Sequence, residues 1–186
     1  MIKLIDTHCH IHDKNYAYAL ESIKLAHKQG VSKFICVGTD LESSILAVDF
    51  AKKHKDLGAF ASIGIHPHEA TNEKLEDSLS SQTWQKIEEL ALEPEVVAIG
   101  EFGFDFFYHK EPESRANQTK LAKKHLDLAK KHNKPLILHI REAFEPFFEI
   151  IKDYSELTGV VHSFSDTPEK LKKMEVGNLI ENHFIF

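Results

Sequence analysis

The chain has 186 residues, of which 42% are hydrophobic and 28% are charged. This size and composition predict a single domain over residues 1–186 with a core of its own. Lys and Arg total 23 against 29 Asp and Glu, so the net charge is −6, which argues against nucleic-acid binding through bulk positive charge. Two cysteines are too few for a disulfide-stapled secreted scaffold.

No segment approaches the ~20 apolar residues of a membrane span, and the first residues lack the apolar stretch of a signal peptide. We therefore expect no membrane association and a cytoplasmic location, or a nuclear one in a eukaryote. The unusual feature is histidine, which occurs 13 times. Because histidine is the commonest metal ligand, its placement along the chain is informative.

Short apolar segments alternate with helical patterns. Near-continuous apolarity predicts strands covered on both faces, as in a parallel sheet. The predicted strands are 3–8, 33–38, 59–65, 96–101, 135–140 and 159–164. The predicted helices are 16–29, 43–55, 82–92, 114–132 and 142–153, with a further helix beginning at Thr167-Pro168.

This repeated strand–helix order predicts either a doubly wound sheet or a (β/α)8 barrel. No glycine-rich phosphate-binding motif follows a strand, which favours the barrel. A complete barrel takes about 250 residues. We therefore expect an incomplete (β/α)8 barrel with about six βα units, lacking its C-terminal strands.

Polar side chains collect where the predicted strands end, which is the active-site edge of such barrels. His8 and His10 are two residues apart on a strand, so both face the same way and can share one cation. Asp6 has the same parity and is a candidate for orienting a ligand from outside the coordination shell. The alternative is an ordinary pair of surface loop histidines.

Three other strands end in ligand-type residues. Glu101 lies between glycines, where a carboxylate can bind one cation or bridge two, although capping of a following helix is the alternative. His139 and His162 end their strands at equivalent positions, and each alone is typical of a hydrogen-bonded core histidine. Together with His8 and His10 these residues form a mixed nitrogen and oxygen set that suits Zn²⁺, Mn²⁺ or Mg²⁺.

Other polar residues at the same edge suit substrate binding. Arg141 is placed to hold a phosphate oxygen, the alternative being a salt bridge to Glu142 or Glu145. His66 and His68 follow the third strand, and we interpret them as facing substrate. The aromatic residues 106–108 either stack on a base or cover the barrel mouth.

In these residues the chain resembles the TatD family of metal-dependent deoxyribonucleases, among the amidohydrolase-like barrels. The resemblance covers about residues 3–174. It is carried by IDTHCH (5–10), GIHPH (64–68), IGEFGFD (99–105), LHIR (138–141) and GVVHSFS (159–165), with Tyr108 and Gln118 also matching.

The resemblance implies a (β/α)8 barrel and hydrolysis of DNA phosphodiesters, commonly as a 3′→5′ exonuclease on single strands or 3′ ends. The implied cofactors are two divalent ions, Mg²⁺ by preference, with Mn²⁺ or Zn²⁺ as alternatives. By position, the implied metal ligands are His8, His10, Glu101, His139 and His162.

One part of the family pattern is missing. The family carries a further metal-binding aspartate after its seventh strand, and nothing in this chain matches it. Glu101 is then the one candidate for the catalytic role of taking a proton from water. Residues 176–186 are either a seventh strand or an unrelated terminus. A complete relative is expected to be a monomer, whereas an unclosed sheet predicts self-association of this chain.

Two other functions are compatible with the sequence. A truncated chain can be a catalytically impaired remnant or a metal-binding module. An amidohydrolase acting on C–N bonds is the second alternative. Those relatives usually carry a carboxylated lysine at the end of the fourth strand, and Glu101 stands there instead.

Overall fold

The computed structural model describes residues 3–71, 74–154, 156–165, 167–170 and 184–185. Its strands form one parallel sheet whose spatial order follows the chain from β1 to β7. The strands are β1 (Leu4–Cys9), β2 (Val31–Val37), β3 (Ala59–Ile63), β4 (Val96–Asp105), β5 (Leu136–Arg141), β6 (Gly159–His162) and β7 (Phe184–Ile185).

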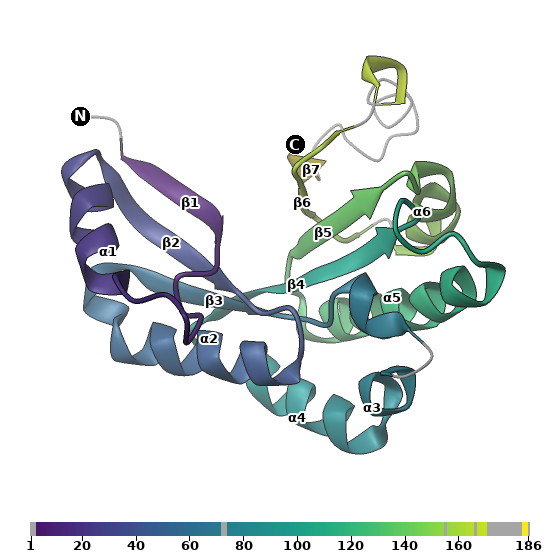
Figure 1. The fold of residues 1–186 in the computed structure, drawn as a ribbon, viewed down its shortest axis with the longest axis horizontal. Coiled ribbons are helices and arrows are strands. Elements are labelled where there is room, and N and C mark those ends of the chain that lie inside the picture. Colours follow the sequence, from purple (N-terminus) through teal and green to yellow (C-terminus); the bar gives the residue numbers. More distant parts are fainter. Residues whose placement is uncertain (1–2, 72–73, 155, 166, 171–183, 186) are drawn as a thin grey trace.

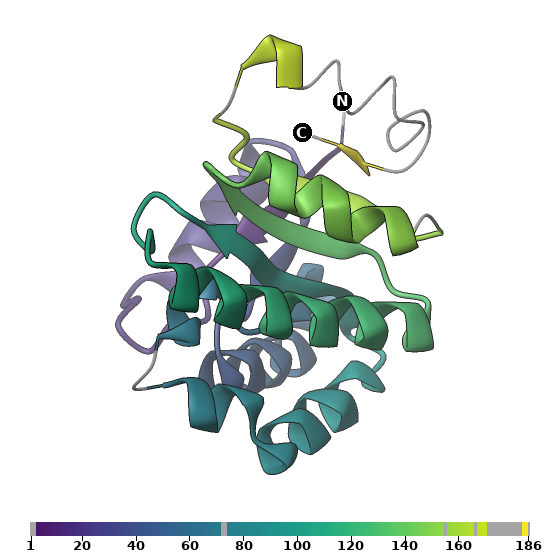
Figure 2. The ribbon, with the colours of Figure 1, turned by 90° about the vertical axis from the view of Figure 1, so that its right-hand side faces the viewer.

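Helices connect the strands and lie on the outer, convex side of the sheet (Figures 1 and 2). They are α1 (Ala19–Lys28), α2 (Leu41–Lys53), α3 (Leu75–Leu79), α4 (Ser81–Ala91), α5 (Pro112–His132) and α6 (Phe144–Ile151), with 3₁₀ turns at Lys55–Leu57, Pro67–Ala70 and Lys152–Tyr154. Local sequence sets their ends: Asp40 caps α2 by accepting from the Ser43 amide at 2.7 Å. Asn133 ends α5 in the left-handed conformation.

The sheet curls strongly, as Figure 1 shows between β1 and β6. In a flat sheet these strands would lie about 24 Å apart, because neighbouring strands are spaced by about 4.8 Å. Yet the imidazoles of His8, on β1, and His162, on β6, stack with their centroids 3.5 Å apart. The sequential parallel order and this curvature give the predicted barrel-type architecture.

The core lies between the sheet and the outer helices. On α6 the predicted apolar stripe is buried, and it comprises Phe144, Phe147, Phe148 and Ile151. The edge strand β1 departs from the expectation that every strand is covered on both faces, since Leu4 is 51% and Ile5 56% exposed. Among the described strands β1 pairs with β2 alone, so it lacks cover that a second neighbour would give.

Each predicted strand is shifted at one end or both, and two of these differences bear on the site. β4 continues four residues past Glu101 to Asp105, and the side chains of Phe102 and Phe104 are buried in the core. β6 ends at His162 because Ser163 turns the chain with a φ of +48°.

The C-terminal segment is described only in part. The predicted helix start is present, since the Lys170 amide bonds to the Thr167 carbonyl at 3.1 Å, but its continuation lies outside the described residues. Phe184 and Ile185 pair with Gly159 and Val160 as β7, so this part of the tail forms a seventh strand. Across the described ranges, no helix has the length and apolarity needed to cross a bilayer.

Candidate metal centre

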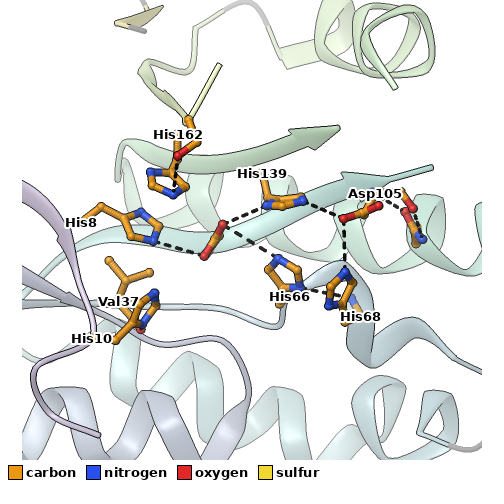
Figure 3. A network of polar contacts seen from close by, with 11 residues as sticks. His8, His10, Val37, His66, His68, Asp105, His139 and His162 are labelled. Atoms are coloured by element: carbon orange, nitrogen blue, oxygen red, sulfur yellow. Dashed lines mark hydrogen bonds and ion pairs between the residues drawn. The ribbon is translucent and has the colours of Figure 1, made fainter. Parts of the chain in front are cut away.

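A cavity of about 420 Å³ opens at the carboxyl ends of the strands. Six imidazoles, two carboxylates and one guanidinium line it, and they come from β1 and the residue after it, from β4, β5 and β6, and from the turn after β3. Figure 3 shows the six histidines and Asp105 around the centre. The lining includes all the predicted ligands and the predicted substrate residues: His8, His10, His66, His68, Glu101, His139, Arg141 and His162. Strand-end reasoning therefore located the cavity, although it did not include Asp105.

Glu101 lies at the centre, and its two oxygens face different histidines. Oε2 is 3.3 Å from His8 Nε2, whereas Oε1 is 3.1 Å from His139 Nδ1 and 3.9 Å from His66 Nε2. Two compact groups of potential ligands result, and both contain Glu101: one with His8 and His162, the other with His66 and His139.

Glu101 is ionised despite its burial. Burial raises the pKa of a carboxyl group, but hydrogen bonds from His139 and His8 outweigh that cost and hold the Glu101 pKa well below its usual range. An ionised buried carboxylate among imidazoles has the chemistry of a cation ligand.

His139 lies between two carboxylates. Its Nδ1 faces Glu101, and its Nε2 is 3.1 Å from Asp105 Oδ2. Burial by itself lowers the His139 pKa, but the hydrogen bonds and charges of Glu101 and Asp105 outweigh burial and raise it. In the absence of a metal, the two carboxylates therefore favour the protonated ring, which can donate to both.

His8 and His162 form the opposite side of the centre. Their rings are nearly parallel, at 12°, and Ser163 Oγ lies 3.0 Å from His162 Nε2. Burial and then the neighbouring His8 lower the pKa of His162, so its ring is neutral. His8 Nδ1 is buried and has no hydrogen-bond partner among the described residues. The neutral His162 ring and His8 Nε2, which faces the ionised Glu101, fit a divalent cation.

His10 lies beside this pair but outside both compact groups. Its ring centroid is 5.1 Å from that of His8. A carbonyl oxygen only accepts, so the 3.0 Å contact with Val37 means that His10 Nδ1 carries the proton. The lone pair is then on Nε2, which is how metal-binding histidines are commonly oriented.

His66 and His68 differ in what they can bind. The His68 amide donates to His66 Nδ1 at 3.2 Å, so the neutral His66 ring carries its proton on Nε2. Burial lowers the His66 pKa to about 3 and keeps the ring neutral. Although His66 lies near enough to join the His139 group, this tautomer points a donor at Glu101 and favours the predicted substrate-facing position. His68 Nε2 contacts Asp105 Oδ2 at 3.2 Å.

A further histidine supports this turn from the core. His125, on α5, is fully buried and stacks on Phe102 at 4.5 Å. Its Nδ1 donates to the Leu121 carbonyl at 2.8 Å, so Nε2 accepts from the Ile65 amide at 2.9 Å. His125 thus fixes the backbone that leads into His66, a role that the helical lysine-rich pattern did not indicate.

Arg141 lies on aromatic rings at the cavity rim. Its guanidinium carbon is 4.0 Å from the Phe107 ring centroid and 4.9 Å from that of Tyr108. Phe106 is buried, whereas Phe107 and Tyr108 are exposed. The aromatic loop therefore supports the guanidinium, an arrangement that sequence reasoning did not foresee.

One carboxylate differs from its expected placement, and a second was not among the predicted site residues. Asp6 Oδ1 accepts from the His8 backbone amide at 3.0 Å, so it contacts the main chain of β1 and not an imidazole. Asp105 had no predicted role, because β4 was expected to end at Glu101. With the strand continued, Glu101, Gly103 and Asp105 share one parity, and that alternation was the signal available in the sequence.

The curled parallel sheet and the histidine–carboxylate cavity at its carboxyl edge define an α/β-barrel protein with a candidate metal centre. A family profile described as TatD related DNase matches residues 5–180. The chain belongs to this family.

Curated relatives that the chain matches are longer than the chain. It is 36% identical over 155 residues to the 3'-5' ssDNA/RNA exonuclease TatD of Rahnella sp. (strain Y9602), which covers 82% of this chain and 56% of the relative. It is 32% identical over 169 residues to the uncharacterized metal-dependent hydrolase YabD of Bacillus subtilis (strain 168), covering 89% and 62%. The chain thus spans less than two thirds of the length of either relative.

Solved structures confirm the fold class. The crystal structure of YJJV, a TATD homolog from Escherichia coli K12, matches with a TM-score of 0.80 at 28% identity, covering 94% of this chain and 65% of that one. A TatD family hydrolase from Entamoeba histolytica matches with a TM-score of 0.78 at 22% identity.

Proposed function

We propose that this chain carries a divalent-metal-dependent phosphodiesterase site that acts on single-stranded DNA, from the 3′ end. The observation that carries the proposal is the position of Glu101. Its two carboxylate oxygens face separate histidine groups inside one cavity. The name of the relative TatD, a 3'-5' ssDNA/RNA exonuclease, supports the substrate class.

In this proposal two cations would be held around Glu101. His8, His10 and His162 would hold the first with Glu101, and His139 would hold the second with Glu101. Divalent ions bound there would supply Lewis-acid activation of water and offset the negative charge that develops on the phosphate. Both Mg²⁺ and Mn²⁺ suit the carboxylate, and the many imidazoles also suit Zn²⁺.

Glu101 acts mainly as a ligand. Its depressed pKa makes the carboxylate a weak base, so it holds a proton poorly at neutral pH. We therefore assign its effect on the rate to the charge and position of its two oxygens.

Three residues at the rim are proposed to bind the substrate. The Arg141 guanidinium, held on Phe107, offers a planar donor to a phosphate oxygen. His66 Nε2–H and His68 offer further donors from the turn after β3. This local set of donors is compatible with a chain of net charge −6, because binding a strand end requires only a short contact.

The test is digestion of a 5′-labelled single-stranded DNA oligonucleotide with Mg²⁺ or Mn²⁺, and of the matching RNA. We expect progressive shortening from the 3′ end. Glu101→Gln should lower the rate by more than about 100-fold, since even residues outside the coordination shell cost about 10–100-fold. Glu149→Gln, which changes an exposed carboxylate on α6, is the matched control.

The outcomes separate the functions. Equal digestion by wild type and Glu101→Gln would show that the nuclease activity does not come from this site. Calorimetric Mn²⁺ binding by wild type without turnover would point to a metal-binding module instead. Digestion of RNA alone would overturn the DNA assignment and keep the metal site.

A further inference from the structure

Asp105 is a completely buried carboxylate at the end of β4. Such a group is costly unless hydrogen bonds satisfy it. Here Oδ1 accepts from the Tyr108 amide at 2.9 Å, while Oδ2 contacts Nε2 of His68 at 3.2 Å and Nε2 of His139 at 3.1 Å. Burial by itself raises the pKa of Asp105, but the hydrogen bonds outweigh burial and lower it, so the carboxylate is ionised at neutral pH and accepts in all three contacts.

The backbone of Asp105 is held as firmly as its side chain. Gln118, buried on α5, accepts from the Asp105 amide at 2.9 Å and donates to its carbonyl at 3.2 Å. One side chain thus satisfies both main-chain groups of a residue at the strand end. This arrangement fixes the carboxylate relative to the core and not only to the cavity.

The consequence concerns the tautomer of His139. An ionised carboxylate only accepts hydrogen bonds, so the contact with Asp105 Oδ2 requires a proton on His139 Nε2. Glu101 Oε1, 3.1 Å from Nδ1, accepts a proton from the metal-free ring in the same way, and a cation bound at Glu101 would replace that Nδ1 proton. Asp105 belongs to neither compact group of potential ligands, so Nε2 keeps its proton and the Nδ1 lone pair is left for the cation.

We propose that Asp105 is a positioning residue that fixes His139 as the Nε2–H tautomer and so directs its Nδ1 lone pair toward the cation site on Glu101. The Asp105 carboxylate also connects the candidate metal centre, through His139, to the aromatic loop at the cavity rim. Through Oδ1 it holds the Tyr108 amide, and Tyr108 and its neighbour Phe107 lie against the Arg141 guanidinium. The proposal rests on the metal site of the proposed function, but it does not require that the substrate be DNA.

The direct test is nitrogen-15 NMR of the histidine rings in the wild-type chain, with His139 assigned by its absence from His139→Gln. In the metal-free chain we expect a proton on Nε2, held by Asp105. With Zn²⁺ added, we expect coordination through Nδ1 with the Nε2 proton retained. An Nδ1–H ring, or coordination through Nε2, would overturn the proposal without any variant of Asp105.

The second test is Asp105→Asn, whose amide nitrogen cannot accept from His139. Calorimetry should show Mn²⁺ binding weakened by about 10–100-fold, as for other groups that orient a ligand, and NMR should show a mixture of His139 tautomers. Asp127→Asn is the matched control, because Asp127 accepts from Tyr154 on the exposed side of α5. It should bind Mn²⁺ as wild type does.

The outcomes distinguish this proposal from the proposed function. Unchanged Mn²⁺ affinity and an unchanged tautomer in Asp105→Asn would overturn the role of Asp105 while leaving the metal site intact. A wild-type chain that binds no metal but shows the Nε2–H ring would remove the proposed function and keep the role of Asp105. If Asp105→Asn does not fold, the wild-type ring measurement alone decides.

Discussion

The two sides of the candidate centre are built differently, although both meet at Glu101. On the β4–β5 side, His139 lies between Glu101 and Asp105, which come from the adjacent strand, and all three are joined by hydrogen bonds. On the β1–β6 side, His8 and His162 come from strands that are not neighbours, and they meet by ring stacking. One side is fixed by strand pairing, whereas the other depends on how far the whole sheet curls.

The two sides also differ in how far they are organised before a cation binds. The His139 side is organised before any cation binds, since its ring already contacts both carboxylates. On the His8 side, His8 contacts Glu101, whereas the neutral His162 ring stacks on His8 and contacts Ser163. A centre of this kind is rigid on one side and completed by its ligand on the other.

The largest expected difference is in stability without metal. His139→Ala leaves Glu101 and Asp105 buried without their shared partner, and removing one member of a buried pair costs about 3–5 kcal/mol. His162→Ala removes a half-buried ring that makes no bond to either carboxylate, and we expect a cost below about 1 kcal/mol. Urea unfolding of both variants at about pH 6 checks the difference. Equal losses would mean that the two sides are equally organised.

The next largest expected effect is a loss of stability when the close contact between β4 and β5 is disturbed. Gly103 has a φ of +144°, and a Cβ added there would lie 2.2 Å from the His139 carbonyl oxygen. Gly103→Ala should therefore push β5 away and lower the unfolding free energy by about 2–3 kcal/mol. Ser81→Ala, at an exposed position in α4, should stay within about 0.5 kcal/mol. If Gly103→Ala unfolds at the same urea midpoint as wild type, the contact between β4 and β5 at this position is not tight.

The smallest effect is a pH dependence of opposite sign on the two sides. The raised pKa of His139 means that its stabilisation is complete below about pH 6.5 and is lost as the pH rises through the folded-state pKa. The lowered pKa of His162 means that its stabilisation is complete above about pH 6.5 and is lost as the pH falls below about 6.5 toward the folded-state pKa of His162. In metal-free protein, the alkaline slope should reach at most about 1.4 kcal/mol per pH unit.

Two variants separate the slopes. His139→Gln should remove the alkaline slope, whereas His162→Gln should keep it, and unfolding midpoints over the neutral range measure both. An alkaline slope that survives in His139→Gln would assign it to another group.

Much of the site was predictable because parallel strands place their carboxyl ends together. Alternating parity put His8 and His10 on one face, and the glycines around Glu101 marked a strand packed against another backbone. The order of strands and helices likewise predicted the barrel-type fold that the solved relatives confirm.

Other features depended on contacts that no local pattern encodes. Asp105 was missed because Gly103 looks like the end of a strand, yet it lets β4 continue against β5. The exposure of β1 was missed because Leu4 and Ile5 have the composition of a buried strand. The stacked pair of His8 and His162 brings together residues that are 154 positions apart in the chain.

The sequence by itself determined which residues stand at the strand ends, because side-chain alternation and apolar runs are local properties of the chain. Only the tertiary structure decided which ring nitrogen faces the cation site, since a histidine tautomer is set by the group that bonds the opposite nitrogen. For His139 that group is Asp105, and for His10 it is the carbonyl of Val37. Both partners come from neighbouring strands, so their positions follow from sheet register and curvature.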